Sequence, residues 1–175
     1  IWQDRFDELN VLGLPRNVED NEQVEMYDIR DTEFILSPEV KVVDMPEFPW
    51  IQPLMTVQIN GIASTMLIDT GALATIVTKS VAERCGLRME EKAIDIAAAT
   101  EGAIASQSAR IDKLVIGASI IKNKRCVIIP DEALDFSVVG GPKIDGLIGW
   151  EIIKHLYWEI DYQNRKVKVR APIHE

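Results

Sequence analysis

Short β-strand patterns, bounded by turn residues, follow one another through the chain from Pro53 onward. Met55, Val57 and Ile59 alternate with polar residues, which is typical of a strand with one buried face. An Asn-Gly pair at positions 60–61 then supplies the backbone freedom that a two-residue hairpin turn requires. Many short strands, frequent turns and few helical stretches predict an all-β fold, a small closed barrel.

The rest of this region continues the same pattern and adds two short helices. Residues 94–99 and 104–114 flank the segment 100–102 and are predicted to form a long hairpin with a mobile tip. Helices are predicted at 80–86 and at 152–156. Further strands are predicted at 64–68, 75–78, 114–116, 125–129, 158–161 and 166–170.

The acidic residues are concentrated at the N-terminal end. The formal net charge is −9, and residues 1–50 hold 13 Asp or Glu against 4 Lys or Arg, so all of that charge belongs to this segment. A cluster of prolines marks the same boundary. We therefore predict an acidic arm over 1–50, a folded domain over 51–171 and a tail over 172–175.

Two interpretations of the acidic arm are open. It is either a partly ordered extension that packs on the domain, with short strands at 34–36 and 40–43, or a regulatory pro-segment. An acidic pro-segment would bind best to a basic surface. Residues 51–175 hold 15 acidic and 15 basic residues, so this balance favours the first interpretation.

Composition excludes several classes of protein. The negative charge argues against a nucleic-acid partner, because phosphate binding requires a basic face. No run of about 18 apolar residues is present, so we expect no membrane segment in this chain. Cys85 and Cys126 show no metal-ligand spacing and are too few for a disulfide framework. They are interpreted as buried thiols and favour a reducing compartment, although the localisation is not determined.

One segment carries a carboxylate in an otherwise apolar setting. Leu67-Ile68 leads directly into Asp69-Thr70-Gly71, with Ala72 following. Taken alone, the tripeptide is compatible with an aspartate that caps its own turn. The segments around it decide between that interpretation and a catalytic one.

The order of these segments resembles the retropepsin-like aspartic proteases, the single-domain family that includes the retroviral enzymes. The resemblance covers about residues 53–170. Four features carry it: the hairpin Val57-Gln58-Ile59-Asn60-Gly61 that leads into Leu67-Ile68-Asp69-Thr70-Gly71-Ala72; the apolar Thr75-Ile76-Val77; a flap-like hairpin about thirty residues after the acid; and Asp145-Gly146-Leu147-Ile148-Gly149 before a short helix and a final strand pair.

The resemblance implies an aspartic endopeptidase that acts on peptide or protein substrates. That chemistry needs two carboxylates, and the chain has one Asp-Thr-Gly, because Asp145-Gly146 lacks the Thr or Ser and is interpreted as a turn. Each subunit of a twofold homodimer would therefore contribute Asp69. The two carboxylates share a proton and activate a water, with no metal, cofactor or covalent intermediate. Residues 167–171 correspond to the strands that build the family's dimer sheet.

The resemblance also gives roles to the residues that follow Asp69. Thr70 would hydrogen-bond across the dimer, Gly71 would let backbone N–H groups approach the carboxylates, and Ala72 would leave space for the substrate. Ile76, Leu147 and Ile148 either line substrate pockets or pack in the core, and both alternatives are open. The flap residues would be Ala99, Thr100, Glu101 and Gly102, with a single glycine that predicts a stiff lid.

The sequence also departs from the retroviral pattern. Leu73 and Ala74 stand where those enzymes tend to carry acidic residues, and Trp150 stands where they often carry Arg. The dimer must therefore be stabilised in another way. The alternative function is a catalytically inactive peptide-binding or assembly module on the same fold, against which the intact Asp-Thr-Gly argues. His155 is interpreted as a surface or packing residue.

Overall fold

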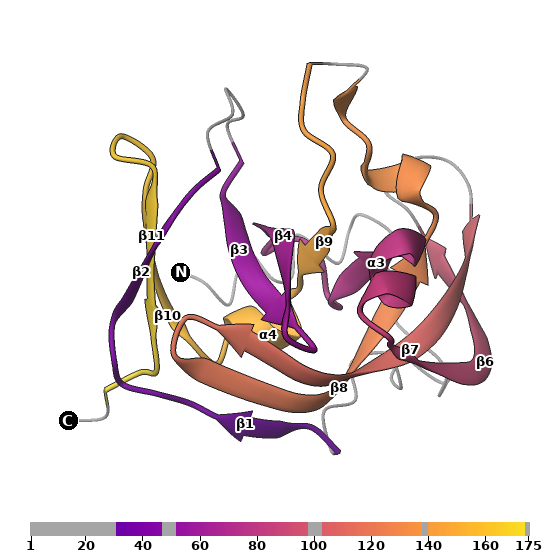
Figure 1. Ribbon diagram of the computed structural model, residues 1–175, viewed down its shortest axis with the longest axis horizontal. Coiled ribbons are helices and arrows are strands. Elements are labelled where there is room, and N and C mark those ends of the chain that lie inside the picture. Colours follow the sequence, from indigo (N-terminus) through magenta and orange to yellow (C-terminus); the bar gives the residue numbers. More distant parts are fainter. Residues whose placement is uncertain (1–30, 47–51, 98–102, 138–139, 174–175) are drawn as a thin grey trace, which may run out of the picture.

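The computed structural model describes residues 31–46, 52–97, 103–137 and 140–173 (Figure 1). Its strands are β1 (Glu33–Ile35), β2 (Lys41–Asp44), β3 (Leu54–Ile59), β4 (Ile62–Ile68), β5 (Ile76–Thr78), β6 (Arg88–Ala97), β7 (Ala103–Ile116), β8 (Ser119–Ile129), β9 (Gly146–Ile148), β10 (Tyr157–Asp161) and β11 (Lys166–Arg170). Its helices are α3 (Lys79–Arg84), the 3₁₀ turn η2 (Asp131–Leu134) and α4 (Trp150–Ile153). The described residues contain no candidate transmembrane helix.

The strands form a closed barrel, as the strand pattern predicted. The hydrogen-bonded order runs β8-β5-β9-β4-β3-β7, and β7 pairs again with β8 to close the ring. Strands β1 and β6 flank the ring on β8 and β7 respectively. Two pairings, β4 with β9 and β5 with β8, are parallel. The short strand β9 lies between β4 and β5, the strands that precede and follow Asp69 in the sequence.

The β3–β4 hairpin follows the predicted alternation. Asn60 and Gly61 have φ values of 49° and 85°, the left-handed conformations that a tight hairpin turn demands. Met55, Val57 and Ile59 are buried, and the polar residues between them are exposed. The apolar face of the hairpin thereby packs into the barrel interior.

Two apolar clusters fill the molecule. The main core lies inside the barrel and includes Met66, Val77 and Ile148. A second cluster lies on the other face of β4, β5 and β9, because neighbouring residues on a strand point to opposite faces. It contains Leu54, Leu67, Ala74, Val127, Ile129, Leu134 and Ile144, with Ile76, Phe136 and Leu147 packed against it.

Part of the predicted acidic arm is built into the sheets. In residues 31–46, β1 pairs with β8 and β2 pairs with β11. Strand β11 is consequently the central strand of a three-stranded sheet, β10-β11-β2, visible at the left of Figure 1. Both backbone edges of β11 are occupied within the chain. This finding argues against the expectation that residues 167–171 pair with a second chain. The boundary at residue 50 stays a prediction.

The predicted long hairpin is formed by β6 and β7. The two strands pair from Arg88↔Arg110 to Ala97↔Ala103, with a register shift between Met89 and Ala93. The tip lies outside the described residues, and so do the four flap residues predicted there, Ala99, Thr100, Glu101 and Gly102.

The second helix differs from its predicted bounds of 152–156. Helix α4 begins at Trp150, directly after Gly149, and ends at Ile153. After it, the N–H of His155 donates to Ile152 O at 3.0 Å, and the N–H of Leu156 to Ile153 O at 3.2 Å. These i→i−3 bonds tighten the chain into a turn that returns toward β10 instead of extending the helix.

Candidate functional site

Asp69 lies at the end of β4, where the chain leaves the barrel. Its N–H donates to the carbonyl oxygen of Ile148 at 3.1 Å, which continues the parallel pairing of β4 with β9. The residue is partly exposed, whereas Ile68 before it is buried. The strand pair thus fixes the backbone of Asp69 and leaves the carboxylate at the surface of the barrel.

The turn after Asp69 closes on the carboxylate itself. The Gly71 N–H donates to Asp69 Oδ1 at 2.8 Å, and the Ala72 N–H donates to the Asp69 carbonyl at 3.2 Å. A Cβ atom on Gly71 would lie 3.2 Å from Asp69 Oδ1, so glycine suits this close approach. Thr70 is exposed beside the turn. Both interpretations of the tripeptide, a self-capped turn and a catalytic one, are compatible with this geometry.

The segment after the turn is held against the start of α4. The Trp150 N–H donates to the carbonyl of Ala72 at 2.7 Å. A side chain at Gly149 would overlap the backbone of Ala74 and the carboxylate of Glu151. Only glycine allows these two chain segments to approach so closely, which explains the second glycine of the Gly146–Gly149 segment.

The three predicted pocket residues divide between the two apolar clusters. Ile76 and Leu147 are register partners on β5 and β9; they are partly exposed and pack on the second cluster. Ile148 is 0% exposed and packs in the main core. The structure therefore leaves Ile76 and Leu147 accessible on the same side of the barrel, and Ile148 in a core position.

Asp145 lies at the opposite end of β9 from Asp69. It accepts the Thr65 N–H at 2.7 Å and pairs with the Arg84 guanidinium at 2.8 Å. The hydrogen bond from Arg84 to this carboxylate raises the pKa of Arg84. These contacts suit the interpretation of Asp145 as a turn residue that anchors the start of β9.

A buried ion pair below the turn was not predicted from the sequence. Lys124 Nζ lies 3.1 Å from Glu151 Oε1, and the two side chains are 0% and 3% exposed. Glu151 Oε1 also accepts the Thr75 N–H at 2.6 Å. Lys124 Nζ donates in addition to the Arg125 carbonyl at 2.7 Å. The pair joins β8, the segment after the turn and helix α4.

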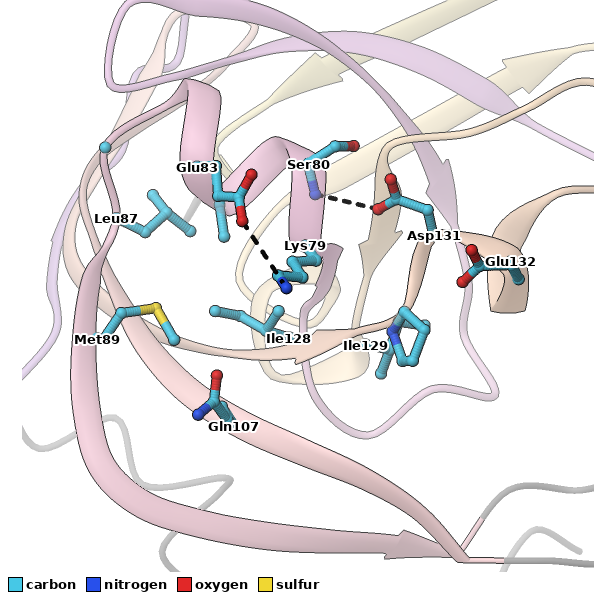
Figure 2. Close-up of a pocket in the computed structure, with 13 residues that line it drawn as sticks. Lys79, Ser80, Glu83, Leu87, Met89, Gln107, Ile128, Ile129, Asp131 and Glu132 are labelled. Atoms are coloured by element: carbon cyan, nitrogen blue, oxygen red, sulfur yellow. Dashed lines mark hydrogen bonds and ion pairs between the residues drawn. The ribbon is translucent and has the colours of Figure 1, made fainter.

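A cavity of about 1140 Å³ lies beside α3 (Figure 2). It is bounded by α3, the β6–β7 hairpin and the end of β8, with Leu87 and Ile128 in its walls. At its rim the Ser80 N–H donates to Asp131 Oδ1 at 3.0 Å, which lowers the pKa of Asp131. None of its lining residues belongs to the segment 69–72.

No group of three or more His, Cys, Asp or Glu side chains that could hold a metal ion occurs among the described residues. The two cysteines are free and buried. From the contacts described above, the candidate site consists of the turn at 69–72 and the apolar side chains of the second cluster. Thr75, Gly149 and Glu151 hold the turn against α4.

Comparisons of the sequence and of the fold with known proteins both find aspartic proteases. A family model described as aspartyl protease matches residues 55–152. A solved structure of a retropepsin-like aspartic protease from Rickettsia conorii is similar, with a TM-score of 0.51 and 18% sequence identity, covering 80% of this chain and 93% of that one. At this identity the similarity concerns the fold.

Two further solved structures are similar at lower scores. The retroviral protease-like domain of Ddi1 from Leishmania major has a TM-score of 0.46 and 21% identity, covering 70% of this chain and 94% of that one. The EIAV protease, in complex with the inhibitor HBY-793, has a TM-score of 0.43 and 18% identity, covering 59% and 86%. A search of curated proteins found no match.

Proposed function

This chain belongs to the aspartyl protease family and has a retropepsin-like fold, and we propose that it is an aspartic endopeptidase whose active site is formed by two chains. The observation that carries the proposal is the position of Asp69. Its backbone is held by the β4–β9 pair, and its partly exposed carboxylate accepts the Gly71 N–H. A rigidly held carboxylate at the surface of an apolar barrel suits a group that must meet both a substrate and a second carboxylate.

The proposed reaction needs Asp69 from each subunit. Two carboxylates about 3 Å apart share one proton, because both cannot easily carry a charge at that distance. The charged member takes a proton from a bound water while the neutral member protonates the carbonyl oxygen of the substrate. Water attacks that carbon, a tetrahedral diol forms, and the proton transfers reverse as the amine leaves.

The neighbouring residues have proposed supporting roles. Thr70, exposed beside Asp69, would hydrogen-bond to the same turn of the second chain. Ala72 would leave room for the peptide backbone. Ile76 and Leu147, which are accessible above the second cluster, would contact apolar side chains of the peptide. The proposed flap residues would cover the bound peptide as a lid; they are Ala99, Thr100, Glu101 and Gly102. Ile148, fully buried, would support β9 from the core side.

The alternative is an inactive module that binds peptides without cutting them. The hydrogen bond from Gly71 to Asp69 is compatible with this alternative as well, because an aspartate that merely caps its own turn makes the same bond. Both functions use the same surface around Asp69 and differ only in the chemistry at this residue.

Cleavage of an unfolded protein substrate by the wild type and by Asp69→Asn separates the two functions. Asparagine retains the oxygen that accepts the Gly71 N–H but cannot exchange the shared proton. We expect the variant to fold and to bind peptide, with cleavage reduced to the background. Asp145→Asn is the matched control, which should still cleave. No cleavage by the wild type with retained peptide binding would support the alternative. Near wild-type turnover by Asp69→Asn would instead exclude the catalytic role of Asp69.

A further inference from the structure

The buried pair of Lys124 and Glu151 lies directly beneath the segment that follows Asp69. Glu151 Oε1 contacts both the Lys124 ammonium, at 3.1 Å, and the Thr75 N–H, at 2.6 Å. Its second oxygen, Oε2, is buried, has no hydrogen-bond partner among the described residues, and faces the position that a side chain on Gly149 would occupy. One carboxylate thus contacts two segments, at Lys124 and at Thr75, that are distant in the sequence from α4 and from each other.

The free-energy cost of burying the charges of Lys124 and Glu151 suggests that the pair has a role other than stability. A buried ion pair is expensive to desolvate, and replacing it by apolar residues of similar volume is often neutral or stabilising. Stability alone therefore gives little reason for the pair. A charged acceptor does, however, make a stronger hydrogen bond to a backbone N–H than a neutral one. The group that donates this bond is the N–H of Thr75, six positions after Asp69.

We propose that Glu151 is a positioning residue for the catalytic turn: held by Lys124, it fixes the Thr75 backbone and thereby the path of the chain from Asp69. The inference rests on the proposed function. The Trp150 N–H, on the residue next to Glu151, bonds to the Ala72 carbonyl at 2.7 Å. The start of α4 therefore holds the turn at Ala72 through the backbone, and the chain that follows it at Thr75 through a side chain.

The same strand, β9, offers a matched control at its other end. There Asp145 also pairs with a basic side chain, Arg84, and also accepts a backbone N–H, from Thr65. The Asp145 contacts thus lie at the start of β9, whereas Asp69 lies near its end. Loss of an anchor at either end should lower stability, but only the loss of Glu151 should move the catalytic turn.

Two double variants separate positioning from stability. Lys124→Met with Glu151→Gln removes both buried charges and keeps an oxygen for the Thr75 N–H. Lys124→Met with Glu151→Met removes the charges and the oxygen together, at similar side-chain length. We expect kcat to fall up to about tenfold for the first, whose neutral acceptor makes a weaker bond to the Thr75 N–H, and about 100-fold for the second. KM should change little in either, because the loss comes from a small misplacement of the reacting groups. Equal kcat in the two double variants would overturn the proposal.

Two additional variants complete the kinetic test. Glu151→Asp keeps the charge but shortens the side chain that reaches Thr75, so kcat should fall about tenfold. This variant still tests the proposal if the Glu151→Met variant fails to fold. Asp145→Asn should retain its kcat. If Asp145→Asn loses kcat as much as Glu151→Asp does, general destabilisation explains both effects and the positioning role is wrong.

Hydrogen exchange tests the proposal without reference to activity. The Thr75 amide should exchange faster when Glu151 is Met than when it is Gln, each with Lys124→Met, while the amide of Met66 in β4 stays equally protected in both. Equal protection of Thr75 in the two proteins would refute the positioning role. Absence of peptide cleavage by the wild type, by contrast, would remove the proposed function and leave this structural result intact.

Discussion

The ring of Phe34 lies 4.3 Å from the imidazole of His155, measured between ring centroids, with an angle of 39° between the planes. Phe34 belongs to β1, inside the segment predicted as an acidic arm, and His155 follows α4. His155 Nε2 is buried without a hydrogen-bond partner in the described part of the chain. Burial, together with the charge of Lys154, lowers the pKa of His155.

The lowered pKa of His155 predicts a loss of stability in weak acid. The unfolded chain binds a proton at His155 near pH 6.5, and the folded chain binds it only at lower pH. The free energy of unfolding should therefore fall as the pH drops below about 6.5. His155→Phe, which cannot take up the proton, should reduce this fall. Urea unfolding at pH 7.5 and 5.5 measures both proteins; an equal loss in the two would contradict the prediction. Asp131, with its lowered pKa, titrates outside this window.

The pH dependence of cleavage should report the pair of Asp69 carboxylates. Because one proton is shared, activity should follow a bell whose limbs belong to the pair and not to one residue. We expect the optimum on the acidic side of neutrality, since the shared proton must be retained. Initial rates from pH 3 to pH 9 measure it. An optimum above pH 8, or inhibition by a chelator, would count against this mechanism.

A site that uses Asp69 from two chains makes activity depend on concentration. Specific activity should fall as the protein is diluted through the dimer dissociation constant. Sedimentation and cleavage assays at the same concentrations provide the comparison. A chain that is monomeric throughout and still cleaves peptides would exclude the two-chain site. Truncation before β11 is a poor test, because β11 is the central strand of its own sheet.

Leu73 offers a sharper test of the dimer. It is 56% exposed and lies four residues after Asp69, so two Asp69 side chains brought together would place both copies of Leu73 near the contact. Leu73→Glu should weaken the dimer by at least about tenfold, since it removes apolar burial on both sides and adds like charges. Circular dichroism should show an unchanged fold. An unaltered dissociation constant would mean that the chains meet elsewhere; Trp150, 47% exposed, is the next residue to substitute.

The cysteines should be inert in the folded protein. Cys126 is buried in the barrel, and burial raises the pKa of its thiol to about 12. Cys85 is buried beside α3. Because the thiolate is the reactive form, a thiol reagent at pH 8 should modify neither residue until the chain unfolds. Both should react in denaturant. Rapid modification of the native protein would show that the barrel opens locally.

Local patterns were enough to predict a small barrel of short strands. The alternation of Met55, Val57 and Ile59 and the turn at Asn60-Gly61 depend only on neighbouring residues, and the structure has the hairpin where they predicted it. The end of α4 was predicted less well, because tightening after Ile153 depends on the return of the chain toward β10. Asp69 was identified by its tripeptide and by the order of segments around it, and its catalytic role stays a prediction.

Lys124 could not be assigned to the interior from the sequence. On β8 both Ile121 and Cys126 are buried in the main core, although strict alternation would put residues five apart on opposite faces. The change of face occurs around Asn123, which has a φ of 53°. A lysine among other basic residues is ordinarily exposed, and only this local twist turns its side chain inward.

The sequence by itself determined the strands, their tight turns and the one carboxylate presented at the end of β4, because these depend on side-chain alternation and local backbone freedom. The tertiary structure decided which distant segments support that carboxylate. Glu151 meets Lys124 and Thr75 only after β8, β5 and α4 are packed together. Likewise β2 covers the edge of β11 from more than a hundred residues away. Such contacts follow from burial and strand pairing across the whole barrel, which no local pattern encodes.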